Sequence, residues 1–165
     1  MTTTEANSES GTRIPAEVAG GVRRVLAVLR RNTTAQGVLL IDEGGQVVAE
    51  AGKGPEERLG TVLPVLADQI GVTQRLEGGW AEEPVFSLHF FEGDGGQIYA
   101  AAGSGFPYLL VVFTTRQGLP PSGVTWLFVR RALQELRTLL RSSQPGTATA
   151  VEKVLRAAEA EQQRG

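Results

Sequence analysis

The chain lacks cysteine altogether and contains a single histidine, His89, among its 165 residues. Without cysteine there is no disulfide framework and no thiol chemistry, a composition that suits a reducing compartment or a thermophile. A zinc-type site cannot be built from one histidine and no cysteine. We interpret His89, within the strand-like run VFSLHFF, as a structural or half-exposed strand residue. We therefore expect no catalytic residue, no metal ligand and no cofactor-binding residue.

Long apolar runs and a strong charge of one sign are also missing. The formal net charge is −2, which suggests neither nucleic acid nor an anionic membrane as a partner. The segment MTTTEANSES lacks the basic region and apolar run of a signal peptide. No apolar run approaches the roughly 18 residues that a spanning helix needs. We expect a cytoplasmic protein that binds no nucleic acid and does not insert into a membrane.

Aliphatic residues are instead concentrated between Leu59 and Leu76, which include eight large aliphatic side chains. At 100° per residue these side chains form two adjoining stripes, about 120° apart. One stripe consists of Leu59, Leu63, Leu66 and Ile70. The other consists of Val65, Val72 and Leu76, with Val62 bridging the two. One stripe can cover a sheet of the same domain, whereas a large apolar patch left in water usually marks an interaction site. The second stripe therefore predicts association with another chain.

The chain divides into three parts by composition. Residues 1–13 are small and polar, and we expect a disordered arm there. Residues 14–142 form the predicted domain. Residues 143–165 are a linker, beginning SSQPGTAT, and a tail in which a weak apolar spacing indicates a short helix.

Within the domain, the patterns predict a helix from about Pro15, a hairpin of strands over residues 37–41 and 46–52, and a helix over residues 62–76 with Thr61 as its N-cap. Asp42 is interpreted as a turn former in the hairpin. Three further strands over residues 84–92, 97–103 and 107–115 form a meander, and a helix follows from Gly123. Its apolar face includes Val124 and Leu127, and its outward residues include Arg130, Arg131, Glu135, Arg137 and Arg141. The order α-β-β-α-β-β-β-α predicts an α+β domain, a five-stranded antiparallel sheet with helices on its faces.

This order of elements, with GVLLIDEGGQVVAEAG as the first hairpin and PYLLVVFTT before the last helix, resembles the roadblock/dynein light-chain superfamily. Bacterial members of the MglB type are the most similar. The resemblance covers residues 15–141. It implies a homodimer in which the middle helices pack together and sheets can join edge to edge. It also implies a bacterial regulator of cell polarity, with no catalytic residues of its own, that binds a small Ras-like GTPase and stimulates its GTP hydrolysis.

On this basis we assign two sets of site residues to the middle helix and its flanks. The predicted dimer interface consists of Val62, Val65, Gln69, Val72 and Leu76. The predicted GTPase-binding residues are Arg58, Asp68, Arg75 and Trp80. The arginines of the first and last helices are interpreted as solvated faces, with contact to an acidic partner as the alternative.

Other motifs are interpreted as structural. The glycine-rich GDGGQ and GSGF connect strands and lack the following helix that a phosphate cradle needs. The pairs Glu56–Glu57 and Glu82–Glu83 lie in polar turns, where solvated charges are more common than an acid–base pair. Two other functions stay open: a dimeric scaffold without effect on nucleotide turnover, and a small-molecule sensor with a pocket between sheet and helix.

Overall fold

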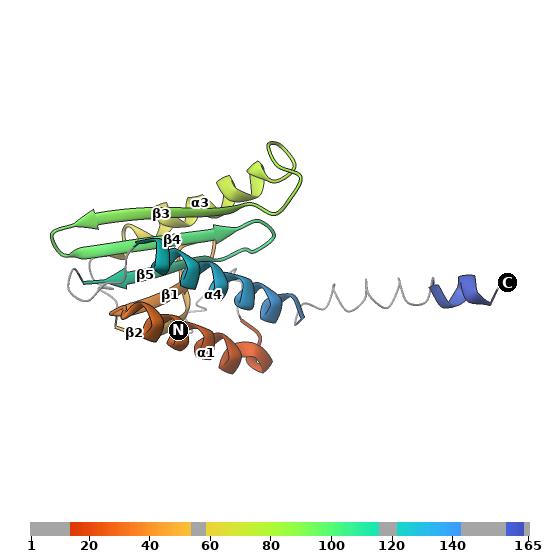
Figure 1. Cartoon of the computed structure of the whole chain (residues 1–165), viewed down its shortest axis with the longest axis horizontal. Helices are drawn as coiled ribbons and strands as arrows, with labels where there is room; N and C mark the ends of the chain where they lie inside the picture. The colour runs from red at the N-terminus through yellow and green to blue at the C-terminus, as the bar shows by residue number, and fades with distance from the viewer. Residues whose placement is uncertain (1–13, 54–58, 116–121, 143–157, 164–165) are drawn as a thin grey trace, which may run out of the picture.

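The computed structural model describes residues 14–53, 59–115, 122–142 and 158–163 (Figure 1). The elements are α1 (Ala16–Thr33), β1 (Gly37–Ile41), β2 (Val47–Gly52), α3 (Leu63–Leu76), β3 (Phe86–Gly93), β4 (Gly96–Gly103), β5 (Leu109–Thr114) and α4 (Ser122–Ser142). The predicted order of helices and strands is confirmed. Residues 158–162 of the tail are also helical. The predicted arm at residues 1–13 and the linker at residues 143–157 lie outside the described residues.

All five strands form one antiparallel sheet in the order β2-β1-β5-β4-β3. Two hairpin-type units, β1–β2 and the meander β3–β4–β5, meet where β5 pairs with β1. These two central strands are buried along their whole length, as their continuous apolar sequences predict. Figure 1 shows α1 and α4 together on one face of the sheet and α3 on the other.

The alternation of side chains along the strands divides the core into two layers. Val38 and Leu40 of β1 pack with α1 and α4, whereas Leu39 and Ile41 pack with α3. In β4, Ala100 and Ala102 face α3, and their small side chains leave room for the helix. On this face of the sheet α3 is the helix that covers the core, and the side of α3 that points away from the sheet faces solvent.

Asp42 organises the turn between β1 and β2, as predicted. Asp42 is 4% exposed, and its Oδ1 accepts hydrogen bonds of 2.9 Å from the backbone N–H groups of Gly44 and Gln46. Gly45 has φ +83°, and a Cβ there would lie 2.6 Å from the backbone of Pro64. The turn therefore requires both the aspartate and the glycine, and it lies against the start of α3.

Asp42→Ala is expected to lower the free energy of unfolding by about 1–2 kcal/mol, because two backbone donors lose their acceptor. Glu43→Ala is the matched control, since Glu43 is the exposed neighbour in the same turn. Urea denaturation of both variants measures the difference. Equal stability of the two would contradict the assigned role of Asp42.

Two local predictions are wrong. The N-cap of α3 is Val62, without a side-chain capping bond, because residues 59–62 already turn and the Val62 N–H donates to the Leu59 carbonyl at 2.8 Å. In α4, Val124 and Leu127 are 39% and 64% exposed. Leu127 lies about 180° around the helix from the buried residues Val129, Leu133 and Leu136, by the 100° spacing, so it cannot reach the core.

Candidate association face

The two stripes of α3 have opposite environments. Leu59, Leu63, Leu66 and Ile70 are 7%, 6%, 6% and 1% exposed and pack on the sheet. Val62, Val65, Val72 and Leu76 are 39%, 66%, 58% and 37% exposed. A helix in a lone globular domain normally turns such side chains inward. We call the outer stripe, Val62, Val65, Gln69, Val72 and Leu76, the association face.

Gln69 occupies the middle of the association face. Val65, Gln69, Val72 and Leu76 follow the spacing i, i+4, i+7, i+11, which places them on one side of the helix. The Gln69 side-chain oxygen Oε1 is buried and has no hydrogen-bond donor among the described residues. An unsatisfied buried acceptor is unfavourable by about 1–3 kcal/mol. The oxygen is covered by the chain itself, so a donor from another molecule can reach it only if the amide turns outward.

Strand β3 extends the exposed apolar surface beside α3. It is the last strand in the sheet order, so its outer edge pairs with no described strand. Ser87 faces α3, since its hydroxyl lies 2.6 Å from that of Thr73. By alternation His89 and Phe91 share this face. Both are exposed, Phe91 by 44%. The sequence prediction of the interface omitted these residues, because strand order decides which strand lies at an edge and a strand's own sequence does not reveal it.

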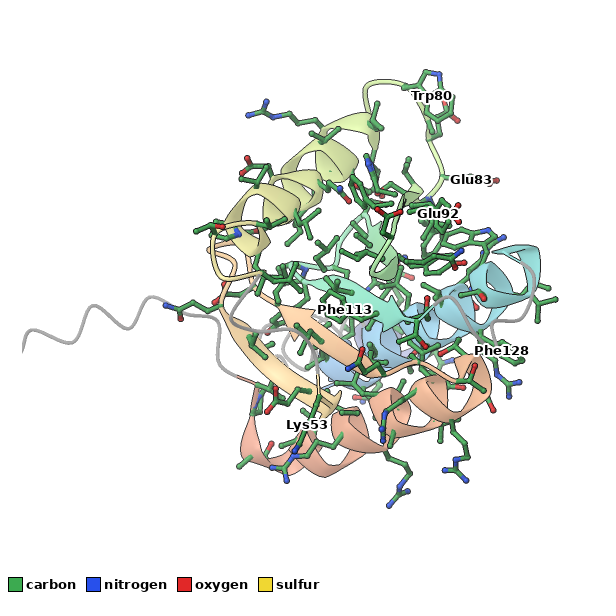
Figure 2. The ribbon with its side chains drawn as sticks, turned by 90° about the vertical axis from the view of Figure 1, so that its left-hand side faces the viewer. Lys53, Trp80, Glu83, Glu92, Phe113 and Phe128 are labelled. Atoms are coloured by element: carbon green, nitrogen blue, oxygen red, sulfur yellow. The ribbon has the colours of Figure 1, made fainter. Side chains whose placement is uncertain are left out.

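The predicted GTPase-binding residues are only partly brought together. Asp68 and Arg75 both line a hollow on α3 that also includes Glu43 of the β1–β2 turn. Trp80 is 77% exposed. Figure 2 shows Trp80 at the outer end of the loop between α3 and β3, away from the sheet. Arg58 lies outside the described residues. Glu43 was not predicted, since its approach to α3 depends on the tight contact of Gly45 with Pro64.

Among the described residues, no three His, Asp or Glu side chains are grouped as metal ligands would be. His89 is exposed on β3, and Glu82 and Glu83 are exposed in the loop before it. The GDGGQ segment is the β3–β4 turn, where Gly96 has φ +138°, and a strand rather than a helix follows. The Glu56–Glu57 pair lies outside the described residues.

No helix in the described ranges combines the length and the apolar composition required to cross a lipid bilayer.

The strand order, with two helices on one face and one helix on the other, defines a roadblock-type domain. The gliding protein MglB from Thermus thermophilus has a similar structure, with TM-score 0.60, 26% identity, and coverage of 79% of this chain and 96% of that chain. An MglB with a tetrameric arrangement gives TM-score 0.61 and 26% identity, covering 80% and 96% of the two chains. MglB from Myxococcus xanthus gives 0.60 and 23%, covering 78% and 94%. By sequence, no family model and no curated protein matches the chain. The chain has a roadblock fold of the MglB type.

Proposed function

We propose that this chain is a homodimeric regulator that binds a small Ras-like GTPase and stimulates its hydrolysis of GTP. The observation that carries the proposal is the solvent-exposed aliphatic side of α3, on a fold of the MglB type. Contiguous exposed apolar surface of this kind marks a protein–protein interface. The MglB resemblance supplies the expected occupants, which are a second copy of the chain and a GTPase.

In the proposed dimer, α3 packs against α3 of the partner subunit. Four aliphatic side chains of the association face supply the apolar contact, and the two copies of Gln69 meet near its centre. There each glutamine can turn its amide outward and exchange hydrogen bonds with its mate, which would satisfy the oxygen that is buried in the single chain. The free edge of β3 lies on the same side of the domain and can pair with a second sheet, as unpaired strand edges readily do. One solved MglB has a tetrameric arrangement, so association of such domains can extend past two copies.

The GTPase would bind across the dimer, near the hollow between α3 and the β1–β2 turn. Asp68 and Arg75 offer one charge of each sign there, which favours orientation of a partner more than affinity. Trp80 adds a large exposed aromatic side chain of the type that dominates binding energy at interfaces. The protein would act by positioning the GTPase's own catalytic groups, so we assign it no catalytic residue.

The test is the rate of GTP hydrolysis by a small Ras-like GTPase, with one encoded beside this chain as the first candidate. Saturating amounts of the protein are expected to accelerate hydrolysis. Trp80→Ala and Arg75→Glu are expected to weaken GTPase binding about tenfold or more. Arg23→Glu, which reverses an exposed charge on α1, is the control and should bind normally. Saturable binding without acceleration would leave a dimeric scaffold as the function.

A further inference from the structure

A second surface, which is polar, lies on the other layer of the molecule, along the solvent side of α4. Five residues of this helix line a pocket of about 450 Å³ together with Glu83 and Pro84 of the loop before β3 and Phe86, the first residue of β3. The five are Arg130, Gln134, Arg137, Thr138 and Arg141. At 100° per residue they share one side of the helix with the exposed Leu127. We call this site the arginine pocket.

Arg137 is the central and least expected member of the arginine pocket. The sequence predicts it to face out, but its Nε atom is buried and has no acceptor among the described residues. The reason is Gly105, where φ is +71° and no side chain fills the turn. A Cβ there would lie 3.2 Å from Nη2 of Arg137 and 3.4 Å from Nη2 of Arg141. Both guanidinium groups therefore lie against the same bare turn.

The positive charges of the pocket outnumber the nearby acids: Arg130, Arg137 and Arg141 are opposed by Glu83 of the lining and by Glu77, whose charge acts on Arg137. In the described part of α4 the ion pair is Arg131–Glu135, at 3.4 Å, beside the pocket lining and not part of it. Neither Arg137 nor Arg141 forms a salt bridge with a described carboxylate. Burial and, next, the charge of Arg141 lower the pKa of Arg137, while the charge of Glu77 partly opposes them, and arginine stays charged at neutral pH. An added carboxylate would form charge-assisted hydrogen bonds with these donors, including the Nε of Arg137 that has no acceptor among the described residues.

Arg130 is fixed at the mouth of the pocket. Its guanidinium lies 5.4 Å from the centre of the Phe86 ring, a cation–π distance that holds the group over the aromatic face. From Arg130 to Arg141 the helix rises about 16 Å at 1.5 Å per residue. Leu127, 64% exposed, continues the row at its other end. The row is thus longer than one small anion and has an apolar end.

We propose that the arginine pocket docks an acidic segment of a partner protein. Its carboxylates would pair with Arg137 and Arg141, and an apolar side chain would pack on Leu127. Carboxylates match the forked donors of arginine in two-bond geometry. A lone phosphate fits less well, because the row of arginines is longer than one small anion and ends on the exposed apolar side chain of Leu127. The site lies across the sheet from α3, so both surfaces can be occupied at once.

The test uses the full chain and a short fluorescent peptide of glutamates and leucines, with its glutamine analogue as the neutral probe. Fluorescence anisotropy is expected to show saturable binding of the glutamate peptide and at least about tenfold weaker binding of the analogue. Arg141→Glu should weaken binding by a similar factor, and Arg137→Gln is the second variant. Arg131→Glu makes the same change in net charge outside the pocket and should bind normally.

Three results would overturn the proposal: no binding by the wild-type protein, equal weakening by Arg131→Glu and Arg141→Glu, or displacement of the peptide by inorganic phosphate at matched concentration. The last result would make the pocket a phosphate site. GTP hydrolysis separates this proposal from the proposed function. Arg141→Glu should accelerate the GTPase as wild type does, while Arg75→Glu should keep its peptide binding.

Discussion

Val65→Asp and Val72→Asp are each expected to convert the protein from a dimer to a monomer while leaving its fold intact. Both side chains are largely exposed in the single chain, by 66% and 58%, so a carboxylate there remains hydrated in the monomer. In the proposed dimer the same carboxylate is buried without a partner, which is unfavourable by about 3–5 kcal/mol. Light scattering measures the mass, and circular dichroism measures the retained helices and strands.

Val28→Asp is the matched control for these two variants. Val28 is a valine on a helix and is 40% exposed, but it lies on α1 in the opposite layer. The control should keep the mass of the wild-type protein. If Val65→Asp and Val72→Asp keep it as well, the association face is not where two chains meet.

Ile70→Ala is expected to have the second large effect, and on a different quantity. Ile70 is 1% exposed and packs in the α3 layer with Leu39 and Val111. Truncating a buried isoleucine removes about 2–5 kcal/mol of unfolding free energy through lost burial and the remaining cavity. The measurement is urea denaturation in a Val65→Asp background, because stability of a dimer depends on protein concentration.

Val72→Ala in the same background is the comparison for Ile70→Ala. Val72 lies two residues further along the helix and is mostly in solvent, so its truncation should change protomer stability by less than about 0.5 kcal/mol. A loss as large as that of Ile70→Ala would mean that Val72 belongs to the core. The two-sided description of α3 would then be wrong.

The sequence predicts those features of the fold that depend on local spacing. The two stripes of α3 follow from the helical period, and the Asp42 turn follows from one side chain that accepts from two nearby amides. The burial of β1 on both faces follows from its continuous apolar sequence. Each of these features is set by residues within about one or two turns of chain, which is why they can be recognised without knowing the tertiary structure.

The features that the sequence does not predict depend on contacts between distant segments. The position of Arg137 depends on Gly105, which reaches α4 only after the meander has formed. The exposure of Leu127 is an exception, since the 100° spacing already places it opposite the buried residues of α4. The edge position of β3 follows from β5 pairing with β1. Long-range pairing therefore determines most of the arginine pocket and the strand component of the association face.

The two surfaces would give the protein two separate roles for its two layers. The α3 layer would hold the second copy and the GTPase, and the α1–α4 layer would present arginines to an acidic partner. A five-stranded sheet lies between them, and its central strands β1 and β5 are fully buried. Substitutions on the association face are therefore expected to leave peptide binding at the arginine pocket unchanged, because distant sites without shared contacts behave additively.

The most direct test of the central claim is sedimentation equilibrium of the wild-type protein over a range of dilutions. The chain has a mass of 17.6 kDa. We expect a particle of at least two chains that persists on dilution, with the valines of α3 inside it. A particle of one chain at every concentration would leave those valines in water and would contradict the account.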